Sequence, residues 1–364
     1  MRLAPLVLIV LLAVPIYSYA STMLRPSSLP LTVRTIEWVR DHHGAALVNT
    51  VEHYYYSWTA PKKGGPPLKA LPVPAQGLVV SRPRHVYLPP PIAPVVKPPL
   101  KGEGLWRTTG AAVNGGPPVL ITVFRPDPNY PRVVAYVAWI DATRTQLALY
   151  PGRYEPPSGS PRGPMRVPQG ERHRLLATFN SGFKYADGGG GFYVNRHTYE
   201  PLVRGKATLV AYTDGTVDIV SWKGGPAGPT VVLARQNLPL IVNGGKRNPT
   251  LNASQSWGST LGNAVRVWRT AVGVDRHGNL LYLAAPAQTA PSLAAAIIHA
   301  GAVRAMELDI NAEWPSFITY RGGHPRKIVP NSMQSATRYL APDDRDFFAV
   351  YQRVPGTSFA VPFK

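Results

Sequence analysis

The segment RAMELDINAEW, residues 304–314, decides how the second half of this chain is interpreted. Glu307, Asp309 and Asn311 stand at every second position of an apolar run, which is the period of a β-strand. These side chains are then expected to share one face, ~6.6 Å apart, while the intervening residues face the core: Met306, Leu308 and Ile310. Carboxylates that close either share a cation or raise each other's pKa, which indicates a functional face. The alternative is a strand end whose polar face is solvated or paired with arginines.

The residues around this segment indicate an α+β fold. A helix is predicted over Pro291–Ala300, because proline favours the first turn of a helix and Gly301 follows its end. It leads into a strand over Val303–Ile310. Hairpin turns are predicted at Asp214-Gly215 and at His277-Gly278-Asn279. Other β-type runs are Trp106–Tyr150, Leu175–Phe179, Ala207–Tyr212, Val217–Ser221, Leu238–Val242, Val265–Val274 and Leu280–Ala284.

The chain is expected to have a strand-rich mixed sheet core with a few helices, preceded by a helical and proline-rich N-terminal extension. Proline-dense sequence favours extended geometry, so that part is predicted to be a spacer or a wrapping arm. The predicted segments are a signal peptide or signal-anchor (1–22), a helical segment (23–60), a proline-rich spacer (61–100), a strand-containing part (101–173), the main domain (174–350) and a tail (351–364).

The apolar amino terminus predicts an extracytoplasmic protein. No charged residue occurs between Arg2 and Arg25, and small residues near Ala20 suit a signal peptidase. A cleaved signal and a retained transmembrane anchor both fit this stretch, because its full uncharged length is just sufficient to span a bilayer. We therefore expect a secreted or membrane-anchored protein of the bacterial cell envelope, with the membrane as a partner if the segment is retained.

The composition excludes several classes of protein. The chain of 364 residues has no cysteine, which rules out disulfides, thiolate nucleophiles and cysteine metal sites. Its net charge of +20 is spread without a polybasic run, so no nucleic-acid partner is predicted. A diffuse positive field favours anionic partners such as phosphate-bearing glycans, although an arginine-rich proteome gives the same charge. Gly-x-Ser-x-Gly, HExxH and Walker patterns are missing.

No metal site and no cofactor are predicted. The adjacent histidines at 42–43 would point to different faces of a helix. Asp309, Asn311 and Glu313 imitate the start of a calcium loop, but Trp314 stands where that loop requires glycine. An EF-hand is therefore excluded, and incidental cation binding by these oxygens stays open.

Further polar residues stand at the ends of predicted strands or within them. An arginine in an apolar strand, such as Arg269 beside Thr270, needs an acidic partner such as Asp309, or a substrate phosphate. Amides and glycines at strand ends can present N–H groups to an anion. The residues of this kind are Asn180, Gly182, Asn243 and Gly244.

Taken in order, these segments resemble the phosphodiester glycosidase family, the bacterial relatives of the lysosomal uncovering enzyme. The matching elements lie within residues 174–350 and are FNSGFK, YTDGTVDI, LIVNGGK, RTAVGVDRHGNLLYL and MELDIN, and RDFFAV near the end fits the same group. The family's usual Leu-Asp-Gly-Gly-Gly-Ser is replaced here by Leu-Asp-Ile-Asn-Ala-Glu, beginning at Leu308.

The resemblance implies hydrolysis of the bond between a sugar's anomeric carbon and a phosphodiester. Arg269 would neutralise the departing phosphate, and Asp309 would stabilise the oxocarbenium-like centre or attack it. Glu307 or Glu313 would manage the proton or the water. The residues expected to bind substrate are Asn180, Gly182, Asn243, Gly244, Thr270, Asn311 and Glu313.

Three functions are therefore compared. The first is an exported hydrolase that cleaves sugars from phosphodiesters of wall or capsular polymers. The second is a non-catalytic wall-glycan-binding protein that keeps the cleft, which the missing glycine turn favours. The third is a structural envelope protein whose proline-rich segment crosses the wall.

Overall fold

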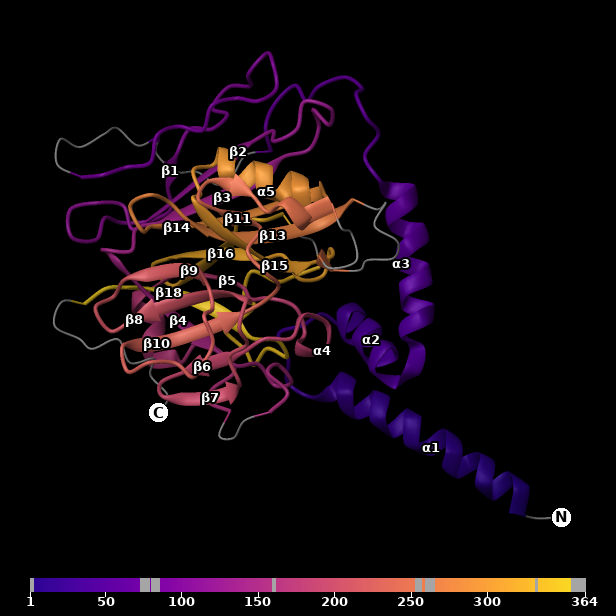
Figure 1. The fold of residues 1–364 in the computed structure, drawn as a ribbon. Coiled ribbons are helices and arrows are strands. Elements are labelled where there is room, and N and C mark those ends of the chain that lie inside the picture. Colours follow the sequence, from indigo (N-terminus) through magenta and orange to yellow (C-terminus); the bar gives the residue numbers. More distant parts are fainter. Residues whose placement is uncertain are drawn as a thin grey trace.

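The computed structural model of the chain describes residues 3–72, 79, 86–158, 162–252, 257–258, 266–330 and 333–354. The described strands form three sheets, and every pairing between them is antiparallel. The predicted α+β class, with a helical segment before a strand-rich core, is confirmed (Figure 1). The helices are α1 (Leu3–Leu24), α2 (Leu31–Val39), α3 (Ala45–Thr59), α4 (Tyr185–Gly188) and α5 (Ala290–His299).

An eight-stranded sheet carries the segment 304–310 as one of its strands. Its strands, in spatial order, are β1 (Arg107–Thr108), β2 (Val119–Phe124), β3 (Ala135–Ile140), β14 (Leu280–Gln288), β13 (Val267–Val274), β15 (Arg304–Ile310), β11 (Val242–Asn243) and β12 (Lys246–Arg247). β15 therefore lies inside the sheet, between β13 and β11. A central position of this kind gives its side chains two buried faces.

Two five-stranded sheets complete the core. The first has the order β7 (His197–Glu200), β6 (Phe192–Val194), β10 (Val231–Gln236), β8 (Ala207–Tyr212) and β9 (Val217–Ser221). The second has the order β17 (His324–Lys327), β16 (Phe317–Arg321), β5 (Leu175–Asn180), β18 (Phe347–Gln352) and β4 (Thr145–Tyr150). Strands from both sides of residue 174 share the second sheet, so the predicted parts 101–173 and 174–350 are packed together.

Two apolar cores lie on opposite faces of the eight-stranded sheet. Ile121 of β2 joins the larger core, which also holds residues of both five-stranded sheets, whereas its neighbour Leu120 joins the second core. Leu293 and Ile297 of α5 belong to that second core, so α5 covers the outer face of the sheet (Figure 1). Successive residues of a strand point to opposite faces, which explains why every residue of β2 is buried.

The local signals for α5 and the hairpins are confirmed. α5 begins after Thr289, whose side chain and that of Ser292 form a reciprocal capping box, and Gly301 follows its end with φ of 110°. Asp214-Gly215 joins β8 to β9, and Gly278 turns the chain between β13 and β14. Both turn glycines have positive φ, 88° and 79°, which glycine adopts without steric cost.

The predicted helical segment is broken at its histidines. α2 and α3 are separated by a kink at His42 and His43, where φ of His43 is 66°. Two contacts fix this segment against the sheets: Val33 packs with Trp314, and Tyr56 packs with Val267. α1 extends away from the rest of the molecule (Figure 1). Within the described residues, no helix combines the length and apolarity that crossing a membrane requires.

Residues 86–100, the last part of the proline-rich stretch, wrap around the domain. Leu88 and Ile92 are buried in the second core, and the Trp106 indole donates to the Pro90 carbonyl at 2.8 Å. This arm runs over the top of the molecule (Figure 1). Of the two forms predicted for the stretch, residues 86–100 therefore have the form of an arm.

Two predictions about strands need correction. Leu238–Val242 was expected to be a strand, but only Val242 pairs, since Pro239 has no N–H to add to a ladder. Ile310 was expected beside Met306 in one core, but it packs in the second core. The cause is a β-bulge, because the pairing of β13 with β15 shifts register before Ile310.

Candidate active site

A cavity of about 590 Å³ opens where the helical segment meets the ends of the sheets. The sheets and their loops contribute Phe183, Lys184, Asp309, Asn311, Trp314 and Arg345 to its lining. The helical segment contributes the opposite wall with Arg40, Asp41, Ala45, Asn49 and Glu52. The lining is rich in charged groups of both signs, which suits a polar, charged ligand.

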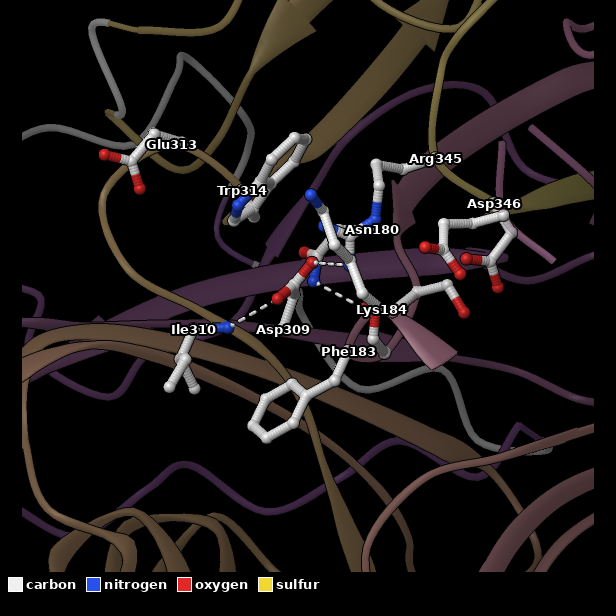
Figure 2. A network of polar contacts seen from close by, with 12 residues as sticks. Asn180, Phe183, Lys184, Asp309, Ile310, Glu313, Trp314, Arg345 and Asp346 are labelled. Carbon is white, nitrogen blue, oxygen red and sulfur yellow. Dashed lines mark hydrogen bonds and ion pairs between the residues drawn. The ribbon is translucent and has the colours of Figure 1, made fainter. Parts of the chain in front are cut away.

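Asp309 is the carboxylate that the strand β15 delivers to this cavity. Its Oδ2 accepts from Nη2 of Arg345 at 2.8 Å, and its Oδ1 accepts from the N–H of Ile310 at 3.0 Å (Figure 2). The residue is 7% exposed. Burial raises the pKa of Asp309 to about 7, although the Arg345 charge acts to lower it. A carboxyl that changes charge near neutral pH is suited to acid–base or electrostatic catalysis.

Arg345 is held by groups on three sides. Besides Asp309, the guanidinium donates to the carbonyl of Gly182 at 3.0 Å and lies 4.5 Å from the ring centre of Trp314. Figure 2 shows Trp314 and Arg345 above Asp309, on the same side of the site. The cation is therefore fixed where it stabilises the ionised form of Asp309.

The predicted catalytic pair Arg269 and Glu307 lies next to the cavity but not in its lining. Nη1 of Arg269 is 2.6 Å from Oε1 of Glu307, and Glu307 is fully buried. The same arginine donates to the carbonyls of Trp257 and Gln288. Arg269 thus pairs with Glu307 and not with Asp309, the acidic partner considered from the sequence. The reason is the bulge in β15, which sends Glu307 and Asp309 in different directions.

Asn180 and Thr270 form a polar support beneath Asp309. The Asn180 amide donates to Oγ1 of Thr270 at 3.0 Å, and its carbonyl oxygen accepts from Tyr282 at 2.8 Å and from the N–H of Ser316. Thr270 in turn donates to the backbone carbonyl of Asp309 at 2.6 Å. Both side chains are buried and bonded, so they position the strand end rather than present free groups to the cavity.

Gly182 allows a close approach between two loops. A Cβ at this position would lie 3.1 Å from Cγ of Asn237, closer than ordinary packing allows. Asn237 donates to the carbonyl of Glu307 at 2.8 Å, so the contact joins the FNSGFK turn to β15. Gly182 therefore sets the position of the carbonyl that Arg345 binds.

Asn311 lies in the cavity lining with φ of 73°, in the left-handed region that asparagine tolerates better than most residues. Its Oδ1 is buried without a hydrogen-bond partner among the described residues. Glu313 is buried outside the lining, and burial raises its pKa to about 7, with Glu52 raising it further. Asn243 and Gly244 occupy the exposed hairpin between β11 and β12, apart from the cavity lining.

Two cations at the cavity form ion pairs with the helical segment: Lys184 joins it to the sheets, and Arg40 joins α2 to α3 within it. Nζ of Lys184 is 2.5 Å from Glu37 and 3.5 Å from Asp41. Arg40 pairs with Glu37 at 2.8 Å and with Glu52 at 2.5 Å. Within the described part of the chain, no three His, Asp or Glu side chains are grouped as metal ligands.

Several contributors to this site were not predicted from the sequence. Lys184 and Arg345 stand in the quoted motifs FNSGFK and RDFFAV, but nothing in the motifs assigns them a role. The wall formed by residues 40–52 could not be predicted, because it depends on how distant segments pack.

The chain was compared with curated proteins and with solved structures. No curated protein matches the chain. Among solved structures, the zebrafish N-acetylglucosamine-1-phosphodiester alpha-N-acetylglucosaminidase catalytic domain, auto-inhibited by its pro-peptide, shares 16% identity over 67% of this chain and 87% of that chain, with a TM-score of 0.39. A hypothetical protein from Synechocystis shares 14% identity over 68% of this chain and 65% of that one, with a TM-score of 0.39.

The family match covers the part of the site that comes from the sheets and loops up to Asp309. The matched range begins before β5 and ends at Asp309 itself, so it includes FNSGFK, Arg269 and Glu307. Residues 173–309 of this chain match the phosphodiester glycosidase family, as the order of the sequence motifs predicted.

Proposed function

We propose that this protein hydrolyses the bond between a sugar's anomeric carbon and a phosphodiester. The observation that carries the proposal is the placement of Asp309, a buried carboxylate on a cavity of about 590 Å³, at the end of the family-matched range. A cavity of that size accommodates a monosaccharide with its phosphate. The paired arginine at 2.8 Å keeps the carboxylate in place before substrate arrives.

In this proposal Asp309 acts in its ionised form. It stabilises positive charge at the anomeric carbon while the bond from that carbon to the phosphate oxygen breaks. The phosphate monoester leaves with the bonding electron pair, and an oxygen of water takes its place on the carbon. The proton of that water passes to solvent. Phosphate is a good leaving group, so the reaction places little demand on a general acid.

The positive charge that receives the phosphate is assigned to the cavity cations, Lys184 and Arg345. Both line the cavity, whereas Arg269 lies outside its lining. Arg269 then supports the reaction indirectly, by keeping the buried Glu307 charge compensated beneath the strand end.

The substrates proposed are phosphodiester-linked sugars of wall or capsular polymers outside the cytoplasm. The apolar amino terminus of the sequence supports export, and the net charge of +20 supports an anionic polymer.

The test is hydrolysis of a panel of sugar-1-phosphodiesters, measured as free reducing sugar. Asp309→Asn should lower kcat at least about 100-fold and change KM less than about threefold, because the lost interaction belongs to the transition state. Asp187→Asn is the matched control, since Asp187 is an exposed carboxylate on the same lining, and it should keep activity within about threefold. An Asp309→Asn enzyme with full turnover refutes the proposal.

A wall-glycan-binding protein without catalysis is the second candidate. The observation in its favour is that Lys184, Arg40 and Arg345 are all paired with carboxylates in the structure. This pairing leaves less positive charge available to stabilise a departing phosphate. Binding of the panel compounds without release of sugar would select this function.

A further inference from the structure

We propose that Asn49 of α3 recognises hydroxyl groups of the sugar, so that the helical segment forms the specificity wall of the pocket. The inference rests on the proposed function for its ligand class, a sugar 1-phosphate group. It adds a residue from the N-terminal extension, outside the family-matched range 173–309.

One face of α3 lines the cavity. Ala45, Asn49 and Glu52 are spaced four and three residues apart, which places them on one side of a helix. All three line the cavity. The small side chain of Ala45 leaves room beside Asn49, one turn away. This face is therefore shaped to admit a ligand against the helix.

The polar side chains of this wall differ in whether they have a partner. Arg40 and Glu52 are bonded to each other, and Asp41 lies 3.5 Å from Lys184. Among the described residues, Asn49 is the one polar side chain of this wall without a hydrogen-bond partner. A free carboxamide offers both donors and an acceptor, and hydroxyl groups require both.

The other side of the cavity carries polar side chains that suit a sugar and its phosphate. Asn311 lines the cavity there, and the Oδ1 of its carboxamide is buried without a partner among the described residues. The cations Lys184 and Arg345 stand on that same side and suit the phosphate. A sugar 1-phosphate with its phosphate toward these cations can direct ring hydroxyls to the uncharged wall of α3.

The wall is fixed in place, which recognition requires. The hydroxyl of Tyr56, one turn beyond Glu52, accepts from the N–H of Ala312 at 3.2 Å. Ala312 adjoins Asn311, so the same contact ties α3 to the opposite carboxamide. At the other end, Lys184 holds Glu37 at 2.5 Å. A residue mounted between two anchored ends can discriminate between sugars by position.

The test uses the full chain and titration calorimetry with glucose, galactose, mannose and N-acetylglucosamine 1-phosphates, and with inorganic phosphate. Asn49→Ala should weaken binding of the preferred sugar 1-phosphate about tenfold, the effect of one lost hydrogen bond, and reduce the preference among epimers. Binding of inorganic phosphate should stay unchanged. Thr50→Ala is the matched control, because Thr50 is exposed and bonds to the Ala46 carbonyl of its own helix.

A second variant guards against an indirect effect. Ala45→Leu narrows the cavity beside Asn49 and should also weaken sugar 1-phosphate binding while sparing inorganic phosphate. Unchanged sugar preference in Asn49→Ala, or equal losses for every ligand including phosphate, overturns the inference. Binding without cleavage of the corresponding methyl phosphodiesters refutes the hydrolase alone. A wild-type protein that binds no sugar 1-phosphate overturns the inference, whereas the hydrolase is judged by cleavage of the phosphodiester panel.

Discussion

Replacing Arg345 by methionine should move the pH dependence of turnover to higher pH. Nη2 of Arg345 is 2.8 Å from Oδ2 of Asp309, and among the described residues it is the cation that forms an ion pair with that carboxylate. An opposite charge at this distance lowers a carboxyl pKa by about 1 to 3. Without the arginine, burial acts on Asp309 unopposed by its partner, and its pKa should rise from about 7 by that amount.

The size of the effect at neutral pH follows from this shift. With a pKa of about 7, half of the Asp309 side chains are ionised at pH 7. A rise of about 2 leaves roughly one in 100 ionised, so this effect alone should lower turnover at pH 7 about 50-fold, and it should be relieved with increasing pH. The lost phosphate contact of Arg345 adds a reduction that is the same at every pH. Because the proposed mechanism requires the ionised form, the wild type should lose activity as pH falls through about 7. The assay is kcat/KM for sugar release between pH 5 and pH 10.

The control is Arg345→Lys, which keeps the positive charge but replaces the planar guanidinium with a single ammonium group. Its pH midpoint should stay within about one pH unit of the wild type. Thermal unfolding of both variants separates misfolding from the electrostatic effect. If Arg345→Met loses activity equally at every pH, Arg345 does not act through the charge of Asp309, and the electrostatic reasoning fails.

Two further variants test the support of the site. Arg269→Met should lower the free energy of unfolding by about 3–5 kcal/mol, because the fully buried Glu307 loses its charge partner; a stable variant whose KM rises would instead place Arg269 on the substrate. Gly182→Ala should cost about 1–3 kcal/mol, since the new Cβ would press on Asn237 at 3.1 Å. Urea unfolding measures both, and an unchanged midpoint for Gly182→Ala would show that the neighbouring loop yields.

Local signals account for what the sequence predicted well. α5 has a proline near its start and a glycine after its end, and β8 and β9 flank an Asp-Gly turn, so short-range chemistry alone locates them. β15 was also predicted, because its polar and apolar residues alternate. Of the polar residues of the alternation, Asp309 and Asn311 line the cavity and Glu307 does not, and their roles stay predictions.

The errors arise where packing overrides a local pattern. One bulge in β15 reverses the faces expected for the residues beyond it, and the pairing partner of Arg269 changes with it. Arg345 lies 36 residues from Asp309 in the chain, and α3 lies further still. No periodicity connects such distant positions, so their convergence at one cavity is a property of the tertiary structure.

The loss of the family's glycine run at this site is smaller in physical terms than it looks in the sequence. Glycine is used where the chain must enter the left-handed region, and Asn311 does so here with φ of 73°. Asparagine is among the residues that tolerate this conformation, and it adds a carboxamide that glycine lacks. The turn after Asp309 therefore has a left-handed residue that also contributes a polar side chain to the cavity lining. The substitution changes what the turn offers to a ligand, so under the proposed function we expect an altered sugar rather than a lost site.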